Sequence, residues 1–264
     1  MINGDRIFNS FNFRKRKYVG NVIFYRDTVT SVMDIIIDNK FIEGTVIIAD
    51  KQLKGRGKDS RKWYSPLGGL YLAYKLVKKV PAIKIQFFYY LNALAVVKTL
   101  EAFNLRPRVK WFNDVLVNNK KICGILIESF FRSNYASPII VGIGINVNIS
   151  KEDFPKELRD KATSMLIELK KHIDRRKLFN NLIDNIDEYV CRAYKGQWKE
   201  IAEEWFNYSI VRNKKVEITL PSGEKLEGVI VGLDYNSGFP ILDINGERYE
   251  TALAGGIEDI RFID

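Results

Sequence analysis

Residues 108–129, RVKWFNDVLVNNKKICGILIES, decide the fold class of this chain. One apolar run leads to Asn118-Asn119, and a second apolar run follows it. Asparagine tolerates the backbone angles of a tight two-residue turn, and apolar runs on both sides are typical of paired strands. The stretch therefore predicts an antiparallel β-hairpin.

Further strands and helices are predicted on both sides of this hairpin. Short apolar or alternating runs predict strands at residues 20–28, 45–50, 68–77 and 138–150. Apolar residues at helical spacing predict helices at residues 30–44, 83–104 and 174–207. Strands and helices in this order predict an α+β fold, in which helices back a mixed sheet.

The composition changes near residue 209. Beyond it, Ser-Gly, Asn-Ser-Gly and Asn-Gly turn sequences separate short apolar runs. This pattern is typical of a small antiparallel β-barrel of about 50 residues. We therefore expect two domains, residues 1–208 and 209–264. The smaller domain is expected to pack on the larger one, because so short a segment cannot bury a large core.

The overall composition excludes several classes of function. Lys and Arg number 42 against 32 Asp and Glu, so the net charge is +10; this suits a polyanionic partner or merely a charged surface. His172 is the only histidine, which argues against Ser-His-Asp catalysis and histidine-based zinc. Cys123 and Cys191 are far apart, so no disulfide framework is expected. Without a long apolar run or a secretory signal, a cytoplasmic protein that does not bind membranes is expected.

Positive charge is concentrated in residues 51–67, which are predicted to form a loop. Residues 51–62 contain six Lys or Arg and one acidic residue, Asp59. Gly55 and Gly57 allow backbone amides to approach a ligand, and amides with cations form a phosphate-binding concavity. Trp63 offers a flat face for a purine. The loop is thus a candidate anion-binding site, although it completes neither a P-loop nor a GxGxxG motif. The alternative is a solvated basic loop.

The hairpin carries a second set of polar residues. Asn113 and Asp114 follow its first strand, and Lys120 and Lys121 follow its turn. An Asn–Asp pair can orient phosphates or help to hold Mg²⁺, and a lysine can neutralise two anions that approach each other. Alternatively, Asn-Asp shapes a turn and the lysines are solvated. Taken alone, the string slightly favours the second interpretation.

Three ordered motifs together resemble the biotin–protein ligase family. The family's pieces are GRGRxxRxWxSPxGGLY, KWPNDVLVNxKKIAGILIE and GIGxNVN. The chain has GRGKDSRKWYSPLGGLY at 55–71, KWFNDVLVNNKKICGILIE at 110–128 and GIGINVN at 142–148. The resemblance covers residues 22–165 well. It implies a class II synthetase-like catalytic domain, with a mixed sheet backed by helices, and a C-terminal SH3-like β-barrel.

The resemblance also implies an activity. Such a ligase uses ATP and Mg²⁺ to convert biotin into biotinyl-5′-AMP, and transfers the biotinyl group to a lysine of biotin carboxyl carrier protein. Joining two anions requires concentrated positive charge, which the catalytic residues Arg56, Lys58 and Lys121 would supply. A loop that closes would protect the adenylate from water. The resemblance also allows a homodimer, because the family often forms one, and an exposed sheet edge could pair here.

Binding roles transfer position by position from the family motifs. The residues matched to biotin contacts are Thr30, Ser31, Gln52, Arg56, Gly57, Lys58, Lys121 and Gly124. The residues matched to ATP contacts are Arg56, Lys58, Trp63, Asn113, Lys121, Asn146 and Arg261. Asn113 and Asp114 match the family's metal–phosphate pair, so they are the candidate Mg²⁺ ligands.

The chain departs from the family motifs at several positions. Lys58 replaces an arginine. Lysine offers a single point charge where the arginine guanidinium could make two parallel hydrogen bonds, so looser retention of biotinyl-5′-AMP is predicted. Phe112 replaces a proline, and Cys123 replaces an alanine. TVTSV at residues 28–32 stands where the family has a clearer Ser/Thr-Thr-Asn stretch.

Two other functions stay open. The first is a lipoate or octanoate ligase or transferase of the same fold, although those proteins lack the residue 55–71 motif. The second is a non-catalytic basic protein that binds nucleic acid, with Trp63 and the barrel as a stacking platform. Sequence-specific DNA binding is not expected, because the roughly 27 residues before Thr28 are too few for a winged-helix domain.

Overall fold

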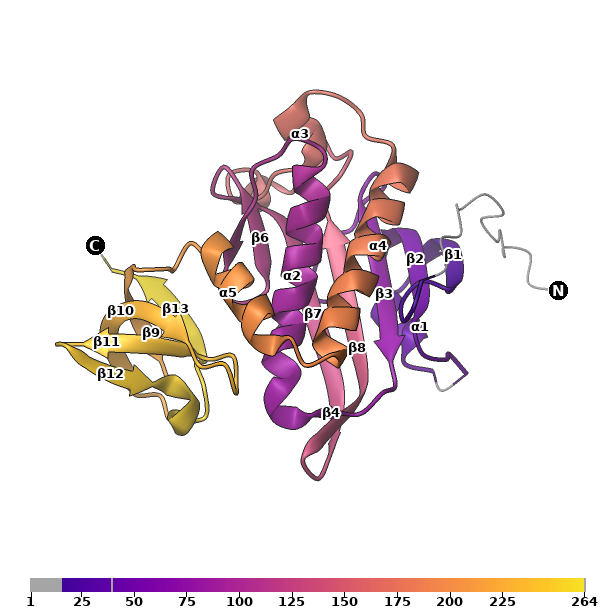
Figure 1. The fold of residues 1–264 in the computed structure, drawn as a ribbon. Helices are drawn as coiled ribbons and strands as arrows, with labels where there is room; N and C mark the ends of the chain where they lie inside the picture. The colour runs from indigo at the N-terminus through magenta and orange to yellow at the C-terminus, as the bar shows by residue number, and fades with distance from the viewer. Residues whose placement is uncertain (1–15, 39, 264) are drawn as a thin grey trace.

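The computed structural model describes residues 16–38 and 40–263 (Figure 1). Its larger sheet has the order β1-β2-β3-β8-β7-β6-β5, and β4 pairs with β8. These strands are β1 Val22–Val29, β2 Thr45–Gln52, β3 Leu70–Leu76, β4 Val80–Pro81, β5 Arg108–Lys110, β6 Asp114–Val117, β7 Lys120–Arg132 and β8 Tyr135–Ile145. β1 and β2 are parallel and the other neighbours are antiparallel, so the expected mixed sheet is confirmed.

The hairpin predicted from residues 108–129 forms the end of this sheet. β5, β6 and β7 are consecutive antiparallel strands. The turn between β6 and β7 contains Asn118 and Asn119 with φ of 49° and 60°, the left-handed conformation that a tight hairpin turn requires. The Asn-Asn signal thus predicted the turn at the right place.

Helices cover the two faces of the sheet unequally. α2 (Ile85–Glu101) and α4 (Arg175–Tyr194) pack on one face, and α5 (Trp198–Tyr208) packs beside α2 (Figure 1). α1 (Val32–Ile36) packs on the other face, and α3 (Met165–Leu169) is a further short helix. Alternate residues of β2 follow this division: Val46 and Ile48 belong to the core of the α2 face, whereas Ile47 and Ala49 pack with α1. The α1 face therefore keeps room for a site.

Two predicted helices differ from those observed. The helix expected at residues 30–44 ends at Ile36, because Phe41 folds back into the cluster under α1. Gly44 then has φ +72° and lies so close to the Tyr18 carbonyl that no side chain would fit. The helix expected at 174–207 is two helices, since Gly196 has φ +83° between them.

The C-terminal segment forms a second, five-stranded antiparallel sheet in the order β12-β11-β10-β9-β13. Its strands are β9 Lys215–Thr219, β10 Lys225–Leu233, β11 Pro240–Ile244, β12 Glu247–Glu250 and β13 Asp259–Phe262. β12 and β13 are the two edges of this order, so the pairings describe a curved open sheet rather than the closed barrel that was expected. Among the described residues, no helix has the length and apolar character needed to cross a membrane.

Candidate active site

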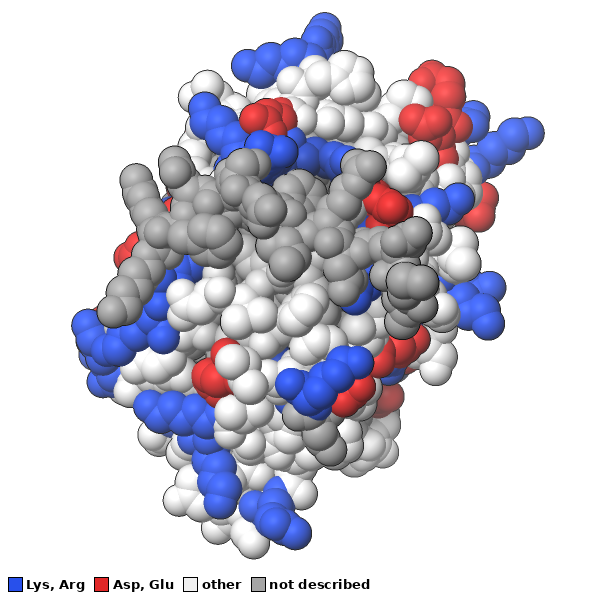
Figure 2. Space-filling view, turned by 90° about the vertical axis from the view of Figure 1, so that its right-hand side faces the viewer, with Lys and Arg blue, Asp and Glu red and all other residues white. Residues whose placement is uncertain are grey.

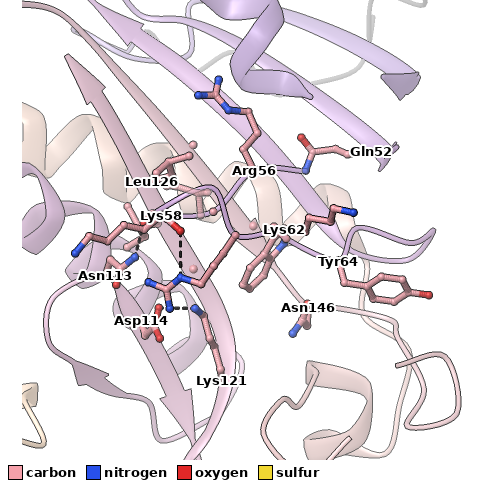
Figure 3. Close-up of a pocket in the computed structure, with 18 of the residues that line it drawn as sticks. Gln52, Arg56, Lys58, Lys62, Tyr64, Asn113, Asp114, Lys121, Leu126 and Asn146 are labelled. Carbon is pink, nitrogen blue, oxygen red and sulfur yellow. Dashed lines mark hydrogen bonds and ion pairs between the residues drawn. The ribbon is translucent and has the colours of Figure 1, made fainter. Parts of the chain in front are cut away.

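A cavity of about 220 Å³ lies on the α1 side of the large sheet (Figure 3). Most residues singled out from the sequence line it: Ser31, Gln52, Arg56, Gly57, Lys58, Trp63, Asn113, Asp114, Lys121, Gly124 and Asn146. Two do not. Thr30 is exposed and uses its backbone carbonyl to accept from the Lys54 amide at 2.8 Å. Arg261 lies exposed on β13, where it pairs with Asp259 at 3.0 Å. Most of the motif residues thus converge on one cavity, and Thr30 and Arg261 lie outside it.

Glycines form the floor of this cavity. Gly124 of β7 lies opposite Gly144 of β8, and Leu126 lies opposite Gly142. A Cβ atom on Gly144 would lie 2.3 Å from Nε1 of Trp63, and one on Gly124 would lie 2.8 Å from the same indole ring. The indole therefore lies directly on a bare stretch of sheet. The GIG and CGI strings of the motifs are explained by this close approach rather than by backbone flexibility.

The basic loop forms a small hairpin at the cavity. Arg56 and Lys62 form an antiparallel bridge, and Gly57 N donates to Arg61 O at 2.7 Å. The turn residues with positive φ are Asp59 (55°) and Ser60 (59°). Gly55 and Gly57 are not among the glycines with positive φ. Gly55 instead provides space, because a Cβ there would lie 2.5 Å from Trp63 O.

Lys121 is anchored at the start of β7. Its Nζ lies 2.6 Å from Asp114 Oδ1 and 5.2 Å from the centroid of the Trp63 ring. Its backbone donates to Lys161 O at 2.9 Å, which ties the residue 161–163 segment to the site. An ammonium group beside a flat ring is suited to an anionic group carried by a ligand that stacks on that ring.

Arg56 lies exposed at the mouth of the cavity, where two carboxylates hold it. Its Nη1 donates to Asp34 Oδ1 at 2.8 Å, and its Nη2 donates to Glu128. Asp34 belongs to α1 and Glu128 to β7, so the guanidinium joins the two elements that flank the cavity. Sequence reasoning missed both partners. Asp34 stands in an ordinary amphipathic stretch, whereas Glu128 ends the GILIE string and could have been suspected.

The deeper part of the cavity is largely apolar, with Val32, Met33 and Leu126 among its walls. Gln52 supports this part rather than pointing free amide groups into it. Its Oε1 accepts from Val32 N at 2.9 Å, and its Nε2 donates to Ser65 Oγ at 2.9 Å. Ser31 Oγ caps α1 by accepting from Met33 N.

Two asparagines are fixed by backbone contacts at the edges of the cavity. Asn113 donates to Ile125 O at 3.1 Å, and buried Asn146 donates to Thr163 O at 3.0 Å. Each side chain therefore keeps a definite direction at the cavity wall, which suits a role in placing a ligand.

Cys123 is adjacent to this site but is not a candidate nucleophile. Its side chain is fully buried, and this desolvation raises the pKa of the thiol far above its ordinary value. A protonated buried thiol is inert, so the replacement of alanine by cysteine at this position adds packing and no chemistry.

The Asn113–Asp114 pair does not by itself fit a metal ion. The Asp114 carboxylate already faces the Lys121 ammonium at 2.6 Å, and a second cation there would be repelled. No cluster of three or more His, Cys, Asp or Glu suited to a metal occurs among residues 16–38 and 40–263. The expectation of protein-held Mg²⁺ at this pair is therefore not supported by its geometry.

Comparisons with known proteins agree with this fold. The model of the biotin/lipoate A/B protein ligase family matches residues 24–146. The chain is 37% identical over 174 residues to the bifunctional ligase/repressor BirA of Bacillus spizizenii. The matched segment covers 64% of this chain and 54% of that protein. It is 27% identical over 228 residues to the biotin–acetyl-CoA-carboxylase ligase of Mycobacterium tuberculosis, covering 83% of this chain and 80% of that protein.

A solved structure is similar over nearly the whole chain. The biotin protein ligase from Aquifex aeolicus, in complex with biotin and ATP, superimposes with a TM-score of 0.77 and 27% identity, covering 92% of this chain and 100% of the other. The chain spans about half the length, 54%, of the Bacillus relative. The glycine floor, Lys121 and the basic loop all fall within the matched segment. Residues 24–146 of this chain are thus similar to the biotin/lipoate A/B protein ligase family.

Proposed function

We propose that this protein is an ATP-dependent ligase that activates biotin as biotinyl-5′-AMP and transfers it to a lysine of biotin carboxyl carrier protein. The observation that carries the proposal is the placement of Lys121 beside Trp63 on the glycine floor, with Arg56 and Lys58 at the same cavity. The Aquifex ligase in complex with biotin and ATP and the named relatives support the same chemistry.

In the first step, the biotin carboxylate attacks the α-phosphorus of ATP and pyrophosphate leaves. Two anions must approach, and the ammonium of Lys121 offsets their repulsion from the cavity floor. Arg56 and Lys58 add positive charge at the mouth. The apolar walls formed by Val32, Met33 and Leu126 hold the ring end of the acid and limit the access of water to the mixed anhydride.

In the second step, the neutral amine of the acceptor lysine attacks the carbonyl carbon of the anhydride, and AMP leaves with the bonding electron pair. The amine loses a proton as the amide forms. Mg²⁺ would accompany the phosphates of ATP, because the Asp114 carboxylate is engaged by Lys121. Trp63 and Asn146 are proposed to contact the nucleotide, whereas Gln52 and Ser31 are proposed to support the biotin side.

The nucleic-acid alternative is less compatible with the site. Trp63 lies against Gly124 and Gly144 and lines the cavity, so a ligand reaches its ring inside the cavity and not on an open surface platform. The lipoate or octanoate alternative shares the fold, so it must be separated by substrate. A homodimer, a cytoplasmic location and the lack of sequence-specific DNA binding stay predictions.

The test is ATP–pyrophosphate exchange, followed by transfer of label to a biotin carboxyl carrier domain. Exchange should depend on biotin and should not be supported by lipoate or octanoate. Exchange with lipoate instead of biotin would support the alternative, and exchange with none of these acids would refute the proposal.

Lys121→Ala is the sharpest variant, because it removes the charge beside the reacting groups. We expect adenylation to fall by about 100- to 1,000-fold. Lys120→Ala is the matched control on the same strand, and it should retain the parental rate because Lys120 does not line the cavity. Equal activity of both variants would show that the cavity is not the catalytic site.

A further inference from the structure

The two positions at which the loop and hairpin motifs depart most from the family pattern are in contact. Lys58 stands in place of arginine and Phe112 in place of proline, and the two are far apart in the sequence. In the structure Nζ of Lys58 lies 4.6 Å from the centroid of the Phe112 ring. This distance is within the range of a cation–π interaction. The two departures therefore form one physical unit.

The Phe112 ring is held by its own neighbours. It packs edge-on against Tyr89 of α2 with a centroid distance of 4.7 Å, and against Trp111 at 5.7 Å. Trp111 is buried, and α2 is a central helix of the fold. The ring is thus a fixed platform at the edge of the cavity, directly before Asn113 and Asp114.

Lys58 has little else to fix its direction. Within residues 16–38 and 40–263 its ion-pair partner is Asp59 at 3.8 Å, and the Asp59 side chain is 65% exposed, so solvent screens this contact. A lysine has a flexible stem and a point charge, and it loses much rotamer freedom when it is held in one place. Figure 3 shows the Lys58 side chain extending toward Asn113. The aromatic face of Phe112 is the contact that favours this direction.

We propose that Phe112 is a positioning residue for Lys58. Its ring holds the ammonium at the Asn113–Asp114 edge of the cavity, where the lysine can retain the phosphate of the activated acid. The Phe112 ring restricts the orientation of the Lys58 side chain. An arginine at this position would need less help, because its planar guanidinium group is already preorganised. When the phosphate binds, the Lys58 ammonium leaves the Phe112 ring and donates a hydrogen bond to a phosphate oxygen. This charge-assisted hydrogen bond is stronger than the contact with a neutral ring.

The inference rests on the proposed ligase activity, and a double-mutant cycle tests it. Phe112→Leu keeps an apolar side chain and removes the ring, whereas Phe112→Tyr keeps an aromatic face. Lys58→Met keeps the length of the stem and removes the charge. Phe131→Leu is the control for loss of an aromatic residue from the same sheet, since Phe131 is 61% exposed and does not line the cavity.

Two quantities are measured for each variant: the KM for ATP in biotin-dependent pyrophosphate exchange, and the labelling of lysines on bystander protein by escaped biotinyl-5′-AMP. Phe112→Leu should raise both by about three- to tenfold with kcat nearly unchanged, whereas Phe112→Tyr and Phe131→Leu should match the parent. In the Lys58→Met background, Phe112→Leu should have almost no further effect, because the partner of the ring is already lost.

Equal effects of Phe112→Leu in both backgrounds would overturn the inference, since the ring would then act through general packing. The inference would also be overturned if the Phe112→Leu variant retained biotinyl-5′-AMP as well as the parent does and had the same KM for ATP. A thermal unfolding curve for each variant identifies any loss of folding. If the unaltered protein shows no biotin-dependent exchange, the proposed function itself has failed, which is a different result from either of these.

Discussion

At the scale of single residues, Arg56 shows how the site balances its charges. The guanidinium is shared by the Asp34 and Glu128 carboxylates at the mouth of the cavity. An anionic substrate that binds Arg56 must compete with both. Exposed ion pairs of this kind contribute up to about 1 kcal/mol, so this competition is weak enough for a phosphate to overcome.

Asp34→Asn should therefore strengthen substrate binding. Removing one competing charge is expected to lower the dissociation constant for biotin or ATP by about two- to fivefold, which isothermal titration calorimetry would measure. Asp38→Asn is the matched control, because Asp38 pairs with Lys40 at 3.1 Å and does not line the cavity. Weaker binding by Asp34→Asn would mean that Asp34 positions Arg56 instead of competing for it.

The sequence predicted the charged residues of the site better than their partners. Arg56, Lys58, Trp63 and Lys121 stand in strings whose order and spacing are distinctive, so they could be assigned before any fold was known. Asp34 carries no such signal, and its contact with Arg56 depends on how α1 sits on the sheet. Arg261 was assigned from the family resemblance alone and lies on the other sheet.

At the scale of elements, the paired glycines of β7 and β8 determine where Trp63 lies. Gly144→Ala should push the indole off the sheet, because the new Cβ would lie 2.3 Å from its Nε1. We expect a rise of about tenfold in the KM for ATP and a red shift of tryptophan fluorescence as the ring gains solvent. Gly232→Ala on β10 should change neither, since a Cβ there meets nothing within 4 Å. An unshifted spectrum from Gly144→Ala would contradict this account of the floor.

The contact between α4 and α5 predicts a pH dependence of stability. Burial alone would raise the pKa of Glu204, but hydrogen bonds from Tyr189 at 2.6 Å and Arg192 at 2.9 Å outweigh it, and the pKa is lowered. A lowered pKa in the folded state contributes stability above the ordinary pKa of Glu, and this contribution is lost as the pH falls through the folded value.

Glu204→Gln should lower the free energy of unfolding by about 2 kcal/mol at pH 7, and the difference should shrink below about pH 4. Urea denaturation at a series of pH values measures this. Exposed Glu200→Gln on the same helix should show little difference at any pH. A Glu204→Gln deficit that stays constant with pH would rule out the ionised carboxylate as its cause.

Element boundaries were predictable where local signals agreed with tertiary packing. The Asn118-Asn119 turn is such a case, because its chemistry demands a left-handed turn wherever the strands lie. The 30–44 segment is the opposite case. Its apolar spacing allows a long helix, but the burial of Phe41 and the close approach of Gly44 to Tyr18 end it at Ile36. Such tertiary contacts leave no mark in local periodicity.

At the scale of the whole molecule, aromatic side chains join the C-terminal sheet to the core of the larger sheet. The ring centroid of Trp111 lies 5.8 Å from that of Trp205 of α5 and 6.5 Å from that of Phe239, which directly precedes β11. The Tyr90 hydroxyl donates to Gly238 O, and Lys84 Nζ donates to Tyr235 O at 3.0 Å. Trp111 also contacts Phe112, which directly precedes the cavity residues Asn113 and Asp114, so the junction between the two sheets adjoins the candidate site.

The face of the molecule toward β1 carries Lys and Arg beside Asp and Glu, so neither sign forms a continuous field there (Figure 2). Intermixed charges give little long-range attraction for a polyanion, and this agrees with assigning the functional cations to the cavity rather than to the surface.

Phe239→Ala tests whether the two sheets unfold as one unit. The substitution removes a half-buried ring from the junction, and we expect the free energy of unfolding to fall by about 2 kcal/mol. Cleavage in residues 209–214, measured by limited proteolysis, should become faster because the C-terminal sheet detaches more often. Phe262→Ala is the control, since Phe262 on β13 is 45% exposed. If only Phe262→Ala accelerated cleavage, or if denaturation of the parent showed two separate transitions, the junction would not couple the sheets.

The Trp111 ring neighbours both Phe239 and Phe112. The same Phe239→Ala variant should therefore also raise the KM for ATP. If the junction only tethers the two sheets, the KM for ATP will stay unchanged.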